Sequence, residues 1–70
     1  MAKYSIRIST VRVNDEDQYG NNEVITCIYV IEAGSMEAAM GKARTYAYFQ
    51  MDDEGCDYIE AVEVRRCADA

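Results

Sequence analysis

The run of residues 23–32, EVITCIYVIE, sets the strongest limit on the fold, because it is apolar on both sides of an extended strand. One side carries Ile25, Cys27, Tyr29 and Ile31, and the other carries Val24, Ile28 and Val30. Such a strand is normally covered on both faces. The 70-residue chain has one helical pattern, and one helix covers only one face of a small sheet. We therefore expect an uncovered apolar face, which marks an interface, unless a long loop folds over it.

The segment before this run reads as a first strand over residues 3–13. Apolar residues stand at even positions from 4 to 8, the period of a strand with one buried face, and then at positions 11 and 13. This slip of phase predicts a β-bulge or a twist near Ser9 and Thr10; in a bulge, one extra residue would redirect the later side chains. Residues 14–22 are rich in Asn, Asp and Gly and predict the tip of a hairpin.

A helix is expected from Met36 to about Met51. Ser35 follows Gly34 and is a suitable N-cap, and Glu37 favours the positive end of the helix dipole. The predicted core stripe consists of Met36, Ala39, Met40, Ala43, Tyr46 and Ala47. The residues predicted to face away are Glu37, Gly41, Arg44, Thr45 and Tyr48.

Residues 58–66, YIEAVEVRR, form the last predicted strand, after a turn in which Gly55 is free to adopt a positive φ. We expect one α+β domain over residues 1–70, of β-β-α-β type, with one helix on one face of a three-stranded sheet. The third strand lies beside the first in the preferred sheet order 2-1-3, which is antiparallel throughout. The alternative order 1-2-3 places it beside the second strand through a right-handed crossover.

Chain direction brings two acid-rich turns to one end of this fold. If the strands and helix run up, down, up and down, the hairpin tip and the turn after the helix share one end. Six carboxylates would gather there: Asp15, Glu16, Asp17, Asp52, Asp53 and Glu54. The last three stand at the helix C-terminus, where the dipole disfavours negative charge. The cluster is therefore a candidate binding site, and ordinary solvated loops are the alternative.

Composition excludes several classes of function. The formal charge of −6 argues against direct nucleic-acid binding, which needs a basic surface, and favours a basic partner. The chain has no histidine, no phosphate-binding glycine loop and no pocket-forming framework for its carboxylates, so we expect no enzymatic activity. Asp15 and Asp17 begin an EF-hand-like spacing, but Thr26 stands where calcium needs a glutamate.

The three cysteines predict neither a disulfide framework nor a metal site. Cys27, Cys56 and Cys67 are odd in number and have no CxxC spacing, and Cys27 is expected to be a small buried hydrophobe. We expect no metal and no cofactor. Without a membrane span or signal peptide, the expected location is the cytoplasm.

The segment VITCIYVIEAGSMEAAMGKARTYAYF, followed by CDYIEAVEVRR, resembles a strand-helix-strand pattern of small phage-encoded proteins, including anti-CRISPR families. This resemblance implies an inhibitor that covers the nucleic-acid-binding surface of a host defence complex. In the cytoplasm of a host bacterium, the cluster of six carboxylates would be the binding site. Together with the uncovered apolar face of residues 23–32, solvent-facing Tyr48 and Arg44, which lies one helical turn before it, are further candidate contacts. The alternative function is a self-assembling structural or accessory subunit that dimerises through its apolar sheet face.

Overall fold

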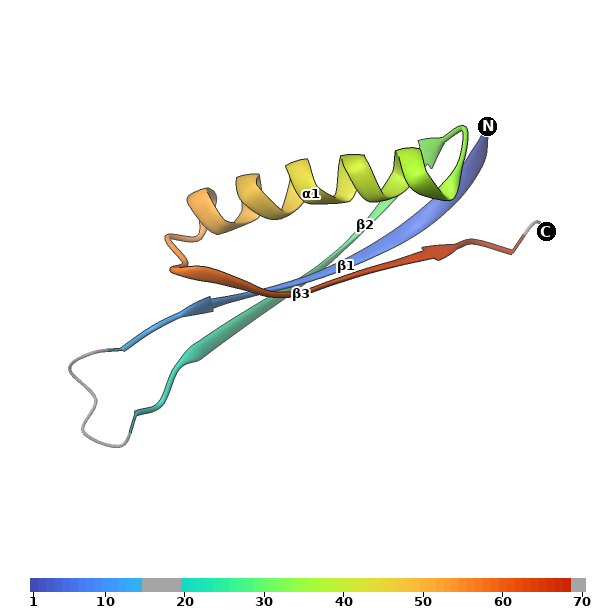
Figure 1. Ribbon diagram of the computed structural model, residues 1–70. Helices are drawn as coiled ribbons and strands as arrows, with labels where there is room; N and C mark the ends of the chain where they lie inside the picture. Colours follow the sequence, from blue (N-terminus) through green and yellow to red (C-terminus); the bar gives the residue numbers. More distant parts are fainter. Residues whose placement is uncertain (15–19, 69–70) are drawn as a thin grey trace.

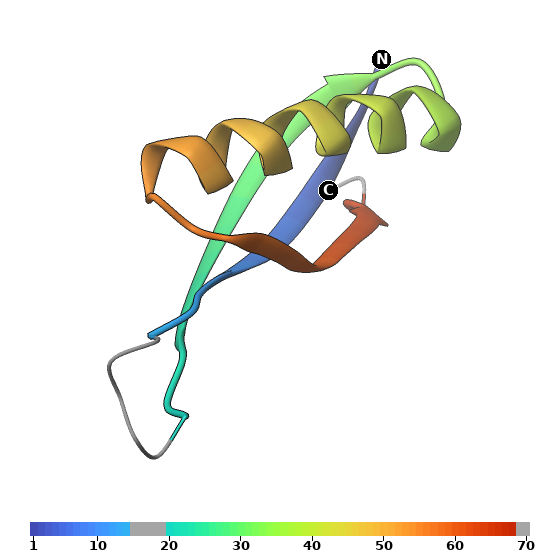
Figure 2. The same ribbon diagram turned by 60° about the vertical axis from the view of Figure 1, so that its left-hand side comes forward.

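The computed structural model describes residues 1–14 and 20–68 and confirms the β-β-α-β arrangement. Its elements are β1 (Ala2–Arg12), β2 (Glu23–Ala33), α1 (Met36–Asp53) and β3 (Tyr58–Arg66). The sheet order is β2-β1-β3, and both pairs of neighbours are antiparallel. Figures 1 and 2 show α1 lying across one face of the sheet, with the other face left open. The preferred order 2-1-3 is therefore confirmed.

β1 is the central strand, and its even-numbered side chains face α1. Tyr4, Ile6 and Ile8 are almost fully buried there. Residues directly opposite on neighbouring antiparallel strands share a face, so Ile31 of β2 joins the same layer as its partner Tyr4. The core cluster is formed by Tyr4, Ile6, Ile8, Ile31, Ala33, Ala39, Ala43 and Ala47.

The buried apolar residues of α1 are all alanines. Ala39, Ala43 and Ala47 are at most 1% exposed, whereas Met36, Met40 and Tyr46 of the predicted stripe are exposed. The small side chains let the backbone of the helix approach the sheet closely, which displaces the larger side chains to the flanks. The predicted N-cap is confirmed, because Ser35 Oγ accepts the N–H of Ala38 at 3.1 Å. The predicted helix end near Met51 was two residues too early.

The predicted irregularity lies at Ser9 and Thr10, but the extra residue belongs to β3. Ser9 pairs with Ala61 and Thr10 pairs with Ile59, so Glu60 of β3 is the unpaired residue. β1 itself pairs with β2 without interruption. The prediction therefore placed the bulge correctly along the sheet and assigned it to the wrong strand.

Gln50 anchors the last turns of α1 to the sheet through a buried polar network. Its Nε2 donates to Ile8 O, Thr10 Oγ1 and Ile25 O, each at 3.2 Å. Tyr29 donates its hydroxyl to Gln50 Oε1 at 2.9 Å. The network ties both β1 and β2 to the helix, directly before the acidic residues at its C-terminus.

The pKa of Tyr29 lies above its ordinary value of 10.0. Burial of the phenol is the main cause, and the neighbouring Cys27 and the negative charges of Asp53 and Glu54 act in the same direction. Cys27 is half-buried, and so are Cys56 and Cys67. Cys27 is therefore less buried than expected, because α1 lies mainly over β1 and β3 and covers β2 less completely.

The molecule is more extended than a chain of its size needs to be. Its radius of gyration is 14.1 Å, compared with about 11 Å for a compact domain of this length. Its accessible surface of 5068 Å² exceeds the roughly 4,400 Å² expected for a folded monomer of 7.9 kDa. The excess surface, about 650 Å² by these two figures, reflects a sheet that only one helix covers.

Candidate functional site

The two segments that lead into the acid-rich turns lie side by side. The N–H of Asp57 donates to Val11 O at 2.8 Å, and the N–H of Val13 donates to Asp57 Oδ2 at 2.7 Å. The end of β1 therefore contacts the turn between α1 and β3, as chain direction predicted (Figure 1). Asp15, Glu16 and Asp17 of the predicted cluster lie outside the described residues.

The second acid-rich turn carries its carboxylates into solvent. Asp52 and Asp53 are the last residues of α1, and Glu54 is the C-cap. All three side chains are exposed, and the last turn of the helix contains no basic residue. Gly55 follows with φ of 64°, as predicted for this turn, and lets the chain leave the helix toward β3.

Arg12 organises this end of the molecule, although no sequence pattern had marked Arg12 as a site residue. Arg12 Nη1 lies 2.6 Å from Glu23 Oε2 on β2, and Nη2 donates to the backbone oxygen of Glu54. The guanidinium therefore joins β1, β2 and the C-terminus of α1, and it binds a carbonyl that the helix itself leaves unpaired. Its position opposite Glu23 in the hairpin register was the available signal.

We define the acidic end as the exposed carboxylates that surround Arg12. They are Glu23, Asp52, Asp53, Glu54 and Asp57. Five carboxylates against one guanidinium leave a formal charge of −4. Residues 11–14, 20–24 and 50–60 contribute no other lysine or arginine. The acidic end therefore presents strong negative charge to solvent.

Tyr48 and Arg44 lie further along α1 and do not join the acidic end. Tyr48 is 60% exposed, as predicted. Arg44 lines a shallow hollow over β3 together with Met40, Val62 and Val64. Arg44 precedes Asp52 by eight residues, or about 12 Å of helix. The aromatic contact of the described chain is made instead by Tyr29 and Tyr46, whose ring centroids are 5.1 Å apart.

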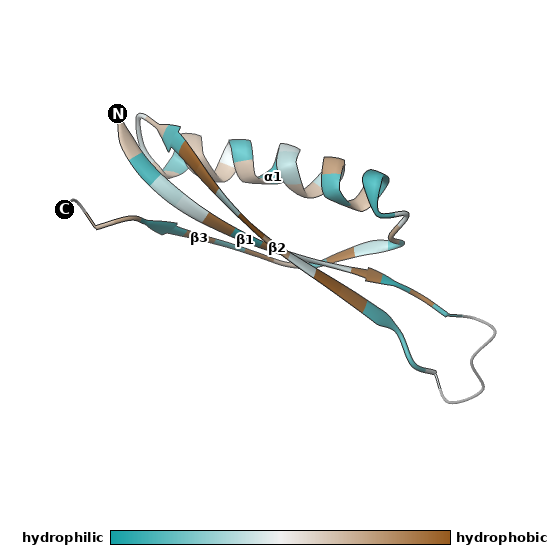
Figure 3. Cartoon of the chain, turned by 180° about the vertical axis from the view of Figure 1, so that it is seen from behind, coloured by the Kyte–Doolittle hydropathy of each residue, from teal (hydrophilic) through white to brown (hydrophobic). Residues whose placement is uncertain are grey.

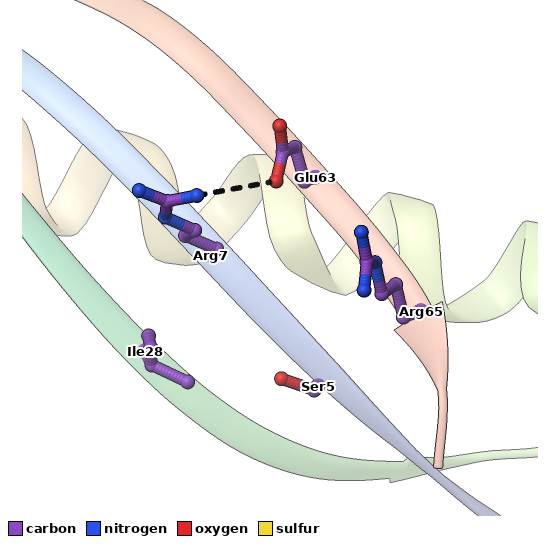
Figure 4. A pocket seen from close by; sticks show the side chains of 5 residues that line it. All are labelled: Ser5, Arg7, Ile28, Glu63 and Arg65. Atoms are coloured by element: carbon purple, nitrogen blue, oxygen red, sulfur yellow. Dashed lines mark ion pairs between the residues drawn. The ribbon is translucent and has the colours of Figure 1, made fainter. Parts of the chain in front are cut away.

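The open face of the sheet is only partly apolar. A hollow of about 220 Å³ on this face is lined by Ser5, Arg7, Ile28, Glu63 and Arg65. Figure 4 shows these five side chains. Arg7 and Glu63 form an ion pair at 3.8 Å across β1 and β3, and because both side chains are more than half exposed it adds little stability. β1 and β3 thus make this region polar, and the expectation of an apolar face holds only for β2.

The most exposed apolar residues of the open face belong to β2. Ile28 is 67% exposed, Val30 65% and Val24 52%. Figure 3, which views the chain from behind, shows hydrophobic residues along this strand. Since the sheet order makes β2 an edge strand, its exposed side chains border an unpaired strand edge.

Comparisons with protein-family models, curated proteins and solved structures found no match to this chain. Within residues 1–14 and 20–68, no three carboxylates or cysteines stand close enough together to hold a metal ion. That part of the chain contains no helix that is both long and apolar enough to cross a membrane.

Proposed function

We propose that the protein inhibits another protein by binding a basic, nucleic-acid-binding surface through its acidic end. The observation that carries this proposal is the formal charge of −4 on exposed carboxylates around Arg12. Carboxylates accept the same charge-assisted hydrogen bonds from arginine and lysine that phosphate oxygens accept. The acidic end would therefore occupy positions that nucleic-acid phosphates take on the partner.

Local electrostatics support a functional reason for this charge. Asp52, Asp53 and Glu54 stand at the negative end of the helix dipole, where each exposed carboxylate costs about 0.3–1 kcal/mol. A basic partner would compensate this cost on binding. The overall charge of −6 would also attract such a partner over a distance and speed the encounter.

The kind of partner follows from the resemblance to phage-encoded inhibitors. A host defence complex of the CRISPR type holds its guide and target strands in positively charged channels. An acidic protein of 70 residues is small enough to enter such a channel or to cover its mouth. The proposed inhibitor needs no catalytic group and no cofactor.

A charge-neutral variant tests the acidic end. We would change Asp52 and Asp53 to Asn and Glu54 to Gln, capture proteins from a bacterial lysate, and release them with a DNA or RNA oligonucleotide. The matched control changes Glu32, Glu37 and Glu63 to Gln, so both variants move the formal charge from −6 to −3.

We expect the control to capture nucleic-acid-binding proteins and the acidic-end variant to lose them. The variant should also be slightly more stable to urea, because it removes charges that the helix dipole opposes. Loss of binding without loss of stability would support the proposal. Equal capture by both variants would show that these carboxylates only solvate the turn.

A self-assembling accessory subunit is the second candidate function, favoured by the exposed apolar residues of β2. Ile28 and Val30 are two-thirds exposed in the isolated chain. Light scattering at several salt concentrations separates the two candidates. Complexes with a basic partner should weaken with salt, whereas association through apolar residues should resist it.

A further inference from the structure

Two backbone hydrogen bonds show which residues of β2 point to the outer edge. Cys67 N–H donates to Lys3 O at 2.9 Å, and Asp57 N–H donates to Val11 O at 2.8 Å. Odd-numbered residues of β1 therefore turn their backbone groups toward β3, and even-numbered residues turn theirs toward β2. In the register that pairs Ile6 with Tyr29, the odd-numbered residues of β2 bond to β1. The even-numbered residues point outward.

The side chains of the same residues make the edge apolar. Val24, Ile28 and Val30 are exposed on the open face, and their backbone N–H and C=O groups point away from β1. The carbonyl of Glu32 also points away from β1, because its oxygen accepts a hydrogen bond from Lys42 Nζ at 2.8 Å. Within the described chain, no other strand lies along this edge.

The two edges of the sheet differ in their protection against pairing. The edge formed by β3 has the bulge at Glu60, and four of its nine residues are charged. β2 has an uninterrupted register, and its charges, Glu23 and Glu32, stand near its ends. Proteins normally block an exposed edge with bulges, charges or prolines. β2 is long and mostly apolar, and it lacks these features over the eight residues from Val24 to Ile31.

We propose that β2 pairs antiparallel with β2 of a second copy of this chain, forming a continuous six-stranded sheet. β2 contains eleven residues, and Ile28 is its middle one. Full overlap about a two-fold axis therefore places Ile28 opposite Ile28. It also places Val30 opposite Thr26 and Glu32 opposite Val24, so every hydrogen-bonded pair joins two outward-pointing residues. The apolar side chains of both copies then form one patch.

The helix side of the same edge carries further exposed aromatic surface. Phe49 is 66% exposed and lines a hollow with Lys42, Thr45 and Tyr46. This flank of α1 lies above β2, because Tyr46 contacts Tyr29. Pairing brings the two flanks toward each other across the axis, and exposed aromatic residues of this kind are enriched at interfaces.

Charge and area agree with a second copy as the occupant. The full-overlap register places Glu23 of the second copy opposite Ala33. Lys42 is close to this position, because its Nζ donates to the carbonyl oxygen of the adjacent Glu32. Both side chains are on the helix side, so opposite charges meet. The apolar area available at this edge includes Ile28, Val30 and Phe49, each about two-thirds exposed. The pairing deepens the self-assembly candidate and uses Glu23 of the acidic end, but not Asp52, Asp53 or Glu54. Since the inhibitor test changes only those three residues, each proposal can fail or stand without the other.

Disulfide trapping tests the register. In a chain whose Cys27, Cys56 and Cys67 are changed to serine, we would introduce Ile28→Cys or, as the control, Val24→Cys. Opposite hydrogen-bonded residues have Cα atoms about 5.5 Å apart, within disulfide range, whereas the two Val24 positions would lie about 27 Å apart. Mild oxidation should give a covalent dimer with Ile28→Cys and none with Val24→Cys. Equal trapping of both variants would overturn the register.

Sedimentation equilibrium tests the contact without any cysteine. Ile28→Lys places two like charges opposite each other and should weaken the dimer by about tenfold or more. Ala61→Lys puts the same charge on the open face of β3 and should leave the dimer intact. Since Ile28 is exposed in the single chain, circular dichroism should show that the variant remains folded. A wild-type chain that stays monomeric, or a dimer that Ile28→Lys does not weaken, would overturn the proposal.

Discussion

Replacing Gln50 tests whether the polar network holds the end of α1 on the sheet. Gln50→Ala removes three hydrogen bonds donated by Nε2 and the one accepted from Tyr29. A buried polar group left without a partner costs about 1–3 kcal/mol. The carbonyls of Ile8 and Ile25 keep their sheet bonds, so the main losses fall on the hydroxyls of Tyr29 and Thr10. Because Tyr29 can reach water, we expect a total cost of about 2 kcal/mol.

That cost is large for a chain of this size, whose core supplies only about 3–5 kcal/mol. Urea unfolding followed by circular dichroism should show the midpoint falling by about 2 M, for a slope near 1 kcal/mol per M. Gln50→Met, which keeps the length of the side chain, should lose nearly as much stability, because the hydrogen bonds and not the volume are removed. In a double-mutant cycle with Tyr29→Phe, the two losses should overlap by about 0.5–1.5 kcal/mol. A cost below about 0.5 kcal/mol for Gln50→Ala would refute the account of the network.

Two further outcomes follow from the fold. Ala43→Leu should cost about 1–3 kcal/mol in urea unfolding, because it forces the helix away from the sheet, whereas Met40→Leu on the exposed flank should change stability by less than about 0.5 kcal/mol. Since the pKa of Tyr29 is raised in the folded chain, its contribution to stability is complete below pH 10.0 and is lost as pH rises through the folded pKa. Tyr29→Phe should therefore flatten the fall of stability above pH 10.0, and the alkaline absorbance titration should lose a tyrosine that ionises above pH 10.0. An unchanged alkaline profile would contradict the assignment.

Local sequence signals were sufficient for most of the architecture. Ser35 and Glu37 marked the start of the helix, Gly55 marked the turn after it, and the third strand was predicted with its observed bounds. These signals depend on backbone geometry near each residue, so one sequence reveals them. The sheet order needed an additional argument, because only the order β2-β1-β3 keeps all strands antiparallel.

Tertiary contacts explain what the sequence did not reveal. Tyr46 has the spacing of a core residue, but the close approach of Ala43 and Ala47 pushes it to the flank of α1. Gln50 and Thr10 look like surface residues, and only the crossing of the helix over β1 buries them together. In the candidate site, chain direction accounts for the contact between the end of β1 and the turn after α1, whereas the role of Arg12 required the strand register.

The prediction of an apolar open face was only partly right, because it was made from β2 without its neighbouring strands. The apolar parity of β2 was read correctly, and Ile28 and Val30 are exposed as expected. The neighbouring strands contribute Arg7 and Glu63 to that face, which a single-strand pattern cannot show. β2 therefore offers an edge for pairing more than a face for stacking.

Amide hydrogen exchange, measured residue by residue by NMR at rising protein concentration, tests the pairing of β2 most directly. In dilute solution the amides of Cys27 and Tyr29 should be protected by β1, whereas those of Thr26, Ile28 and Val30 should exchange rapidly. At concentrations where the dimer forms, Thr26, Ile28 and Val30 should become protected as well. If these three amides exchange rapidly at every concentration, β2 does not pair with a second copy.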